Sequence, residues 1–221
     1  MTKKAKEWTE AELVLTFKLH RNTSYETPLM KEWLSVDLPN FSAVEQFIFD
    51  DIYKKAVEKI TGWSEEDLKM KFIAFVLSLG TLTDEGNIVT FFDKKISASV
   101  EGIKLTVKSD FMLATGFMNL YTNPYFHFQE YKPQLNPTGE PMAQLLEAFL
   151  IAQEKNRVEN PQNQQPIYGV EVIGANWRFV IIENKDYCIS KSYDCTDRED
   201  LLKIIAILRN FKRILYTKLI Q

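Results

Sequence analysis

Charged residues at the end of an aromatic strand are the first feature of this chain that could do chemistry. Residues 125–133 read YFHFQEYKP, and alternate side chains of a strand share a face, so one face should carry Phe126, Phe128, Glu130 and Lys132. His127 should face the other way, and we assign it no role. Burying a charged pair is costly unless the charges are paired or bound to a metal. The pair therefore indicates either an exposed strand end, which Pro133 favours, or a functional site.

A third charged residue, Asp110, favours a functional site. It lies in the segment Lys108–Phe111, KSDF, on the strand that we expect beside Glu130. Two carboxylates on neighbouring strands suit a hard cation such as Mg²⁺ or Mn²⁺, and the backbone carbonyl of Tyr131 could add a third oxygen ligand. Lys132 would then lie beside a water bound to that metal. There it could orient the water for attack on a phosphate or stabilise negative charge on the phosphate.

These residues resemble the motif of the PD-(D/E)XK nuclease superfamily. Ser109-Asp110 match its Pro-Asp position, with Ser in place of Pro, and Glu130-Tyr131-Lys132 match its (D/E)-x-K position. The order of the expected helices and strands over about residues 64–182 is also similar to that family. Because the acid carries the chemistry, the absence of the proline matters little.

Among the members of that superfamily, the sequence is most similar to an uncharacterised bacterial branch with a helical N-terminal extension. In that branch the E-Y-K strand is followed by a helix that bears Gln and by a YG…W.F strand pair. The corresponding residues here are Gln144, Tyr168-Gly169 and Trp177-Arg178-Phe179. The resemblance implies a restriction-endonuclease-like fold, an α/β three-layer sandwich with a mixed central β-sheet flanked by helices.

The resemblance also implies an activity. A protein of this kind would be a Mg²⁺- or Mn²⁺-dependent endonuclease that hydrolyses phosphodiester bonds, with DNA as the expected partner, and many enzymes of the family work as homodimers. Asp110 and Glu130 would hold the metal, and Lys132 would assist the attacking water. Gln144 would touch the substrate phosphate or the waters around the metal, unless it is an ordinary surface residue.

The family often takes a further acid from the helix before the first strand. Glu66 is the residue that we select, with Glu65 and Asp67 as alternatives. Acids in the first turn of a helix are also favoured by the helix dipole, so all three have a purely structural explanation as well. The choice therefore stays open.

Composition favours a single large domain. The chain has 221 residues, of which 45% are hydrophobic and 13% aromatic, enough for a substantial core. A net charge of −3 argues against strong, non-specific binding to nucleic acid. The last 21 residues are nevertheless basic and contain no acid, which predicts either a phosphate-binding helix or a solvated helix face. Their basic residues are Lys203, Arg209, Lys212, Arg213 and Lys218.

The same inspection leads us to expect a cytoplasmic protein without a membrane partner. No apolar run approaches the ~20 residues of a membrane span. The basic start, MTKKAKEWTE, is not followed by the apolar stretch of a secretory signal.

Hydrophobic patterning predicts helices first and strands later. Ser42 to Glu45 fits a capping box that opens a helix to about Ile60, with Val44, Phe47, Ile48, Ile52 and Ile60 near one stripe. Glu101-Gly102 is typical of a tight hairpin turn. Helices are expected at 9–19 (whose end could be strand), 28–34, 42–60, 64–79, 137–156 and 198–217, and strands at 88–100, 103–113, 125–132, 167–172, 177–182 and 187–191. We divide the chain into a helical N-terminal extension, 1–62, packed on a nuclease-like core, 63–221.

A non-enzymatic protein is the alternative. The chain would keep the nuclease fold as a catalytically inactive module that binds nucleic acid or a partner protein. The acidic pI of about 5.6 favours this interpretation, as does a sequence without a helix-turn-helix or zinc-finger signature. The intact set of Asp110, Glu130 and Lys132 argues against it.

Overall fold

A mixed β-sheet forms the middle layer of the residues that the structure, a computed structural model, describes: 7–24, 27–162 and 165–220. Its eight strands are β1 (His20–Asn22), β2 (Ile88–Val100), β3 (Ile103–Phe117), β4 (Leu120–Lys132), β5 (Ile167–Ile173), β6 (Asn176–Glu183), β7 (Asp186–Ile189) and β8 (Tyr193–Asp194). The strand order is β1-β7-β6-β5-β4-β3-β2, and β8 pairs with β6. β1 runs parallel to β7 and β4 runs parallel to β5, whereas the other neighbouring pairs are antiparallel.

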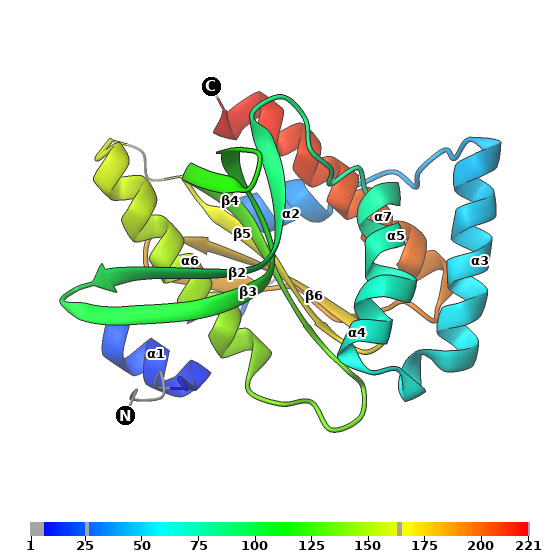
Figure 1. Cartoon of the computed structure of the whole chain (residues 1–221), viewed down its shortest axis with the longest axis horizontal. Helices are drawn as coiled ribbons and strands as arrows, with labels where there is room; N and C mark the ends of the chain where they lie inside the picture. Colours follow the sequence, from blue (N-terminus) through cyan, green and yellow to red (C-terminus); the bar gives the residue numbers. More distant parts are fainter. Residues whose placement is uncertain (1–6, 25–26, 163–164, 221) are drawn as a thin grey trace.

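Helices cover both faces of this sheet (Figure 1). One face carries α1 (Glu10–Phe17) and α6 (Pro141–Glu159). The other side carries α2 (Pro28–Leu34), α3 (Ala43–Lys59), α4 (Glu65–Leu68), α5 (Ala74–Leu79) and α7 (Arg198–Ile214). The prediction of an α/β fold with a mixed sheet and flanking helices is confirmed. None of the helices in the described residues combines the length and apolar character needed to span a bilayer.

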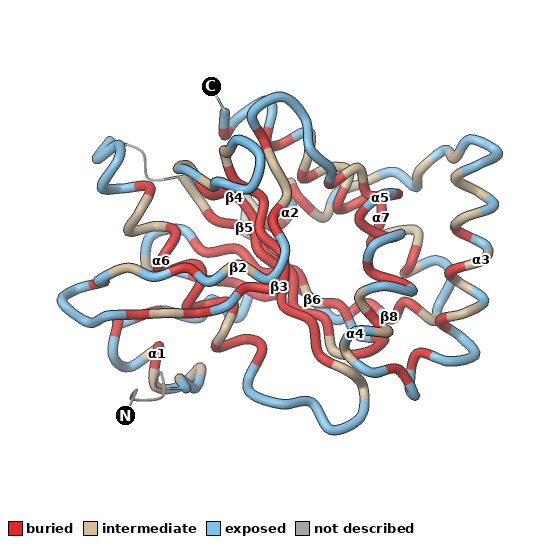
Figure 2. The backbone as a smooth tube through the Cα atoms, in the orientation of Figure 1, coloured by how far each residue is buried: buried red, intermediate tan, exposed pale blue. Residues whose placement is uncertain are grey.

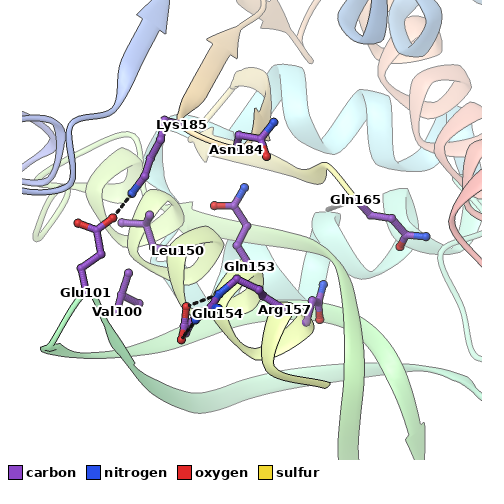
Figure 3. A pocket seen from close by; sticks show the side chains of 10 residues that line it. Val100, Glu101, Leu150, Gln153, Glu154, Arg157, Gln165, Asn184 and Lys185 are labelled. Atoms are coloured by element: carbon purple, nitrogen blue, oxygen red, sulfur yellow. Dashed lines mark hydrogen bonds and ion pairs between the residues drawn. The ribbon is translucent and has the colours of Figure 1, made fainter. Parts of the chain in front are cut away.

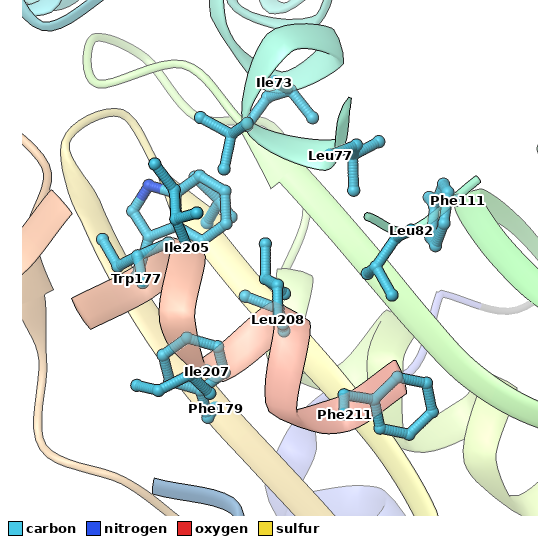
Figure 4. Packing of buried hydrophobic residues seen from close by; sticks show 14 of the residues in the cluster. Ile73, Leu77, Leu82, Phe111, Trp177, Phe179, Ile205, Ile207, Leu208 and Phe211 are labelled. Atoms are coloured by element: carbon cyan, nitrogen blue, oxygen red, sulfur yellow. The ribbon is translucent and has the colours of Figure 1, made fainter. Parts of the chain in front are cut away.

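Each face of the sheet has its own hydrophobic core. The core beneath α2, α4, α5 and α7 includes Trp33, Trp177 and Phe211, and part of it is drawn in Figure 4. The core beneath α1 and α6 includes Phe17 and Phe149. Figure 2 shows that the middle strands are buried along most of their length, as expected for strands that are covered on both faces.

Local sequence signals set several element boundaries as predicted. Thr9 and Ser42 each form a capping box with the glutamate three residues later, so α1 and α3 begin where expected. Residues 10–17 are helical, which resolves the ambiguity left by their sequence. Glu101 and Gly102 have φ angles of 50° and 81°, the backbone of a tight turn, and join the registered pair Val100 and Ile103.

The segment 1–62, which we expected to be helical, also contains a strand. It contains β1, which pairs in parallel with β7 at the edge of the sheet. Residues 1–6 and 25–26 of this segment lie outside the described residues, as do residues 163–164 of the expected polar loop and residue 221. The long helix after β4 begins at Pro141 rather than near residue 137.

The apolar stripe expected on α3 was partly wrong. Val44 and Phe47 are 69% and 75% exposed, and the buried residues are Phe49, Ile52 and Ala56. α3 lies at the rim of the molecule and contacts α5 and its neighbouring turns rather than the sheet, so only a narrow stripe is covered.

The expected face of Phe126 was also wrong, because β4 contains an irregularity. Leu113 of β3 pairs with His127 but Ala114 pairs with Tyr125, so Phe126 is skipped in the ladder. Phe126 therefore joins the core beneath α7, while Phe128 joins the core beneath α6. From His127 to Lys132, where β4 pairs regularly with β5, side chains alternate between the two faces of the sheet. His127 contacts Phe211 and so lies on the face opposite Glu130, as predicted.

Candidate active site

The candidate site lies where β3 and β4 separate. The antiparallel pairing between them ends at Phe111 and Gln129, and β4 continues to Lys132 paired only with β5. Asp110 precedes Phe111 on β3 and lies just beyond this last pair. Its Oδ2 accepts a hydrogen bond from the backbone N–H of Tyr131 at 2.8 Å. A side chain thus satisfies an N–H that the ladder leaves without a strand partner, and this fixes Asp110 beside Glu130.

Glu130 has an unusual environment for a carboxylate. It is 1% exposed, and neither of its side-chain oxygens accepts a hydrogen bond from a donor of the described residues; the neighbouring polar group is the carboxylate of Asp110, with which a protonated Glu130 can share its proton. Burial raises the pKa of Glu130 well above its ordinary value, and the charge of Asp110 raises it further, more than the ammonium of Lys132 lowers it. A buried carboxyl without a partner is costly, so the position indicates a role other than stability.

Lys132, the third member of the predicted set, is 6% exposed and points toward α4. Its Nζ donates to Oε2 of Glu65 at 3.4 Å. Glu65 is the first residue of α4, whose N-terminus is capped by Ser64. Burial raises the pKa of Glu65, but the hydrogen bond from Lys69 and the charge of Lys132 outweigh it and leave that pKa below its ordinary value.

A second lysine, Lys69, enters the site and was missed by sequence reasoning. Its Nζ donates to Oδ1 of Asp110 at 2.7 Å and to Oε1 of Glu65 at 2.8 Å, and it lies 3.8 Å from Oδ1 of Asp93. Burial lowers the pKa of Lys69, but its hydrogen bonds to Asp110 and Glu65 raise it more, so the ammonium form is favoured. The spacing of Glu65 and Lys69 was visible in the sequence as an i, i+4 pair, but the contact with Asp110 arises only in the fold.

The helix carrying Lys69 changes geometry at this residue. Lys69–Ile73 form a π-helical turn between α4 and α5, which shifts the following side chains relative to an unbroken α-helix. The N–H of Lys69 still bonds back to Glu65 and Glu66 of α4, and the turn that follows keeps Phe72 and Ile73 in the core. Such turns often occur at functional sites.

The structure therefore brings Asp110, Glu130 and Lys132 together and adds Glu65 and Lys69 to them. Glu66, our selected helix acid, is exposed, and Asp67 pairs with Lys71 at 2.5 Å. Of the three acids considered, Glu65 is the one that contacts Lys132.

Comparison with models of known protein families finds no match for this chain, and comparison with curated proteins finds none either. The site must therefore be interpreted from its own geometry.

The donor set fits a hard cation only in part. Across the described residues, no three His, Cys, Asp or Glu side chains form a group that could hold a metal ion. Asp110 and Glu130 are the two acids that would bind the cation, and both oxygens of Glu130 are buried without a hydrogen-bond donor among the described residues, so they could accept a cation or a proton. Asp110 already has both oxygens hydrogen-bonded, so a cation would have to displace the ammonium of Lys69 from Oδ1.

Gln144 lies on α6, next to Lys132. The two residues line a cavity of about 540 Å³, and Oε1 of Gln144 is buried without a hydrogen-bond partner among the described residues. Glu147, one turn further along α6, lines the same cavity and accepts from the backbone N–H of Thr106 at 2.9 Å. Burial raises the pKa of Glu147 to about 7. Sequence reasoning missed Glu147, because a glutamate on a helix is normally a surface residue.

A second cavity, of about 430 Å³, lies at the other end of α6 (Figure 3). Its charged residues pair with one another, Lys185 with Glu101 and Arg157 with Glu154. We assign it no chemistry.

The basic C-terminal helix does not present a row of unpaired cations. Each of its five basic residues forms an ion pair with an acid of another element or of its own first turn. The acids are Glu199 for Lys203, Glu45 for Arg209, Glu85 for Lys212, and Glu32 for Arg213 and Lys218. This arrangement favours the solvated or paired helix face over a phosphate-binding surface.

Proposed function

We propose that this protein is a metal-dependent nuclease that hydrolyses phosphodiester bonds, with DNA as its substrate. The observation that carries the proposal is Glu130, a buried carboxyl that accepts no hydrogen bond from the described residues and lies close beside Asp110. The chain retains this costly group at a strand end together with Lys132. A cation bound by both acids would give Glu130 the partner that the protein itself does not supply.

Mg²⁺ or Mn²⁺ bound to Asp110, Glu130 and the backbone carbonyl of Tyr131 would supply a Lewis acid that polarises the phosphate and acidifies a water. The protein supplies the positioning. Asp110 is held by the N–H of Tyr131, and Lys132 is held by Glu65, so the acids and the ammonium keep fixed relative positions. Lys132 would orient the attacking water or stabilise the charge that develops on the phosphate oxygens.

The local topology supports a restriction-endonuclease-like fold as the finer proposal. Asp110 lies on β3 just beyond the last pair of the β3–β4 hairpin, and Glu130-Tyr131-Lys132 end β4. The helix α6 then leads to β5, which runs parallel to β4. This is the arrangement that the resemblance to PD-(D/E)XK nucleases implies. If the substrate is duplex DNA, two copies of the chain would be needed to cut both strands at once.

Cleavage of plasmid and oligonucleotide DNA with Mg²⁺ or Mn²⁺ tests the proposal. The parent protein should cut, and Lys132→Ala should reduce the rate by about 100-fold or more, because a preorganised charge at the reacting phosphate is lost. Lys104→Ala is the matched control, since Lys104 is an exposed lysine of β3 outside the site, and it should cut like the parent.

Equal cleavage by the parent, Lys132→Ala and Asp110→Ala would show that the activity does not come from this site. Cleavage by none of them, without any binding of Mn²⁺, would argue for the second candidate below.

A catalytically inactive module that binds nucleic acid or protein is the second candidate. The observation that favours it is Lys69, whose ammonium is hydrogen-bonded to both Asp110 and Glu65 and so neutralises the site without a metal. Under this reading the charges form a structural network.

Titration calorimetry with Mn²⁺ separates the two candidates. A nuclease should give a binding heat that disappears in Asp110→Asn, whereas an inactive module should give no heat that depends on Asp110. Asp51→Asn provides a control, because Asp51 is a half-exposed acid of α3 that pairs with Lys55 outside the site, and this variant should bind Mn²⁺ like the parent.

A further inference from the structure

The cavity beside Lys132 combines the groups that recognise a nucleotide. It lies between α6, β3 and the residues that precede α1 and α6, and Figure 1 shows α1 near the N-terminal end of α6. Its volume of about 540 Å³ lies in the range of small-molecule sites, roughly 300–1,000 Å³. Lys132 belongs both to this cavity and to the candidate active site, so whatever occupies the cavity lies next to the reacting centre.

The lining combines an aromatic ring with several polar side chains. Trp8 contributes an indole, and it packs on Phe17 with ring centroids 5.9 Å apart. Gln144 lines the cavity, and its buried Oε1 has no hydrogen-bond partner among the described residues, while Glu147 contributes a carboxyl that accepts from the N–H of Thr106. An aromatic plane together with hydrogen-bonding groups suits a flat heterocycle with polar edges, which describes a nucleobase.

Two lysines lie on the sheet side of the same cavity, and their ammonium groups pair with acids beside it, Lys108 with Asp93 at 3.0 Å and Lys132 with Glu65 at 3.4 Å. Lys108 and Lys132 line it from β3 and β4, whereas Glu140, at its other side, accepts a hydrogen bond from the backbone N–H of Glu10 at 2.8 Å. A phosphate would be attracted to the lysines and repelled by the acids of the lining, which are Glu7, Glu140 and Glu147. The cavity thus orients a nucleotide with its base toward α6 and its phosphate toward Lys132.

We propose that this cavity receives one unpaired base of a nucleic-acid strand, so that the phosphate beside that base lies at Asp110, Glu130 and Lys132. A base within a duplex is stacked and paired and cannot enter a cavity, so the preferred substrate has a single-stranded segment. The inference rests on the proposed function for its claim that this phosphate is the one that is cut. The claim that the cavity binds a base stands independently of it.

The cavity of Figure 3 is less suited to binding a nucleobase. Its lining residues are aliphatic, amide and charged, and its charges form the pairs Lys185–Glu101 and Arg157–Glu154. Gln153 lines that cavity from α6, the helix that also carries Gln144. The two glutamines therefore provide a matched pair of variants on one helix.

The test measures binding in EDTA, so that no cleavage occurs, with a fluorescein-labelled mixed-sequence 12-nucleotide DNA strand and its duplex as probes. The parent should bind the single strand more tightly than the duplex, and the unlabelled strand should quench tryptophan fluorescence. Trp8→Leu should abolish most of the quenching and weaken binding of the single strand by about tenfold, the effect of one lost stacking contact. Trp33, Trp63 and Trp177 are buried and should contribute little to the quenching.

Gln144→Ala gives a second measurement that does not depend on the packing of Trp8 against Phe17. It should weaken binding of the single strand several-fold, whereas Gln153→Ala should bind like the parent. Equal affinity for single strand and duplex, or affinity that neither Trp8→Leu nor Gln144→Ala changes, overturns the proposal.

Cleavage of the same probes with Mn²⁺ separates this inference from the proposed function. Binding that depends on Trp8 without any cleavage would leave the base site standing and remove the nuclease. Cleavage that depends on Lys132 but is equal in the parent, Trp8→Leu and Gln144→Ala would leave the nuclease standing and remove the base site.

Discussion

Asp110 and Glu130 raise a problem of charge at the level of single residues. The charge of Asp110 opposes ionisation of Glu130, and burial opposes it more strongly. Two ammonium groups lie among the acids of this site: Lys69 contacts Asp110 and Glu65, and Lys132 contacts Glu65. The group is neutral when Glu130 carries a proton. A divalent cation in place of that proton and of the Lys69 contact is what the proposed function requires.

Lys69→Met tests this account of the charges. Removal of the ammonium leaves Asp110 buried beside Glu130 without its partner, so the free energy of unfolding in EDTA should fall by about 2 kcal/mol. Mn²⁺ should then raise the Tm of Lys69→Met more than that of the parent, because the cation no longer competes with the lysine. Differential scanning calorimetry with and without Mn²⁺ measures both effects.

Lys71→Met is the control for that experiment. Lys71 lies on the same helical segment but forms an exposed pair with Asp67, so its loss should change stability by less than about 0.5 kcal/mol. A Tm of Lys69→Met that equals the parent value would show that Asp110 does not depend on Lys69.

Glu147 should make stability depend on pH. Burial raises its pKa in the folded protein to about 7, above the ordinary value of 4.5. The folded state therefore binds the proton more tightly than the unfolded state, and this stabilisation is present at low pH and is lost as pH rises through about 7. Relative to Glu147→Gln, the parent should lose about 2 kcal/mol of unfolding free energy between pH 5 and pH 8.

Urea unfolding of both proteins at the two pH values measures this difference. The glutamine keeps an acceptor for the N–H of Thr106, so the comparison isolates the titration. Glu154→Gln, on the same helix in an ion pair with Arg157, should follow the parent. Parallel pH profiles for the parent and Glu147→Gln would contradict the assignment.

At the scale of elements, two departures from regular geometry shape the site. The skipped residue Phe126 sets which face each side chain of β4 occupies from His127 onward. The π-helical turn Lys69–Ile73 begins at the residue that contacts Asp110. Asp93 of β2 is a third irregularity. Its φ is 54°, and it lies between the residues of β2 that pair with Phe111 and Ser109 of β3. Irregularities of this kind re-aim side chains and are common beside functional sites.

The turn between β2 and β3 offers a test at this scale. Gly102 has a φ of 81° with open space around it, so Gly102→Ala meets no clash but requires a left-handed backbone. The substitution should reduce the free energy of unfolding by about 1 kcal/mol. Gly62→Ala, which also has open space but no such φ, should be neutral or slightly stabilising. Chemical denaturation of the two variants checks this, and equal effects would contradict the explanation from φ.

At the scale of the whole molecule, the N-terminal segment is part of the core. Trp33 of α2 lies between the sheet and α7, donates from Nε1 to the carbonyl of Ile207 at 3.0 Å, and contacts Tyr168 and Phe179 edge-on. α1 helps to cover the other core, with Leu13 and Phe17 buried. Residues before position 63 therefore contribute to both cores rather than forming a separate unit.

Trp33→Ala should consequently destabilise the whole protein. Loss of a buried indole and its hydrogen bond should reduce the free energy of unfolding by about 3–5 kcal/mol, in one cooperative transition. Phe47→Ala removes an aromatic ring that is 75% exposed and should change it by less than about 0.5 kcal/mol. Two separate transitions in the parent, one of them insensitive to Trp33→Ala, would contradict the shared core.

The sequence by itself determined the features that depend on neighbouring residues. The capping boxes at Thr9 and Ser42, the turn at Glu101-Gly102 and the strands around Asp110 and Glu130 follow from local hydrogen bonds, backbone preferences and alternation. These signals were sufficient for the α/β class and for the proximity of the three predicted charges, because adjacent antiparallel strands must lie side by side.

Only the tertiary structure decided which other groups meet them. Lys69 contacts Asp110 because the end of α4 packs at the sheet edge, and Glu65 rather than Glu66 faces Lys132 because of how α4 is rotated against β4. The cavity of Trp8, Gln144 and Glu147 joins segments far apart in the chain. Burial and charge at these positions depend on packing between elements, and no local pattern encodes which face of a helix will be covered.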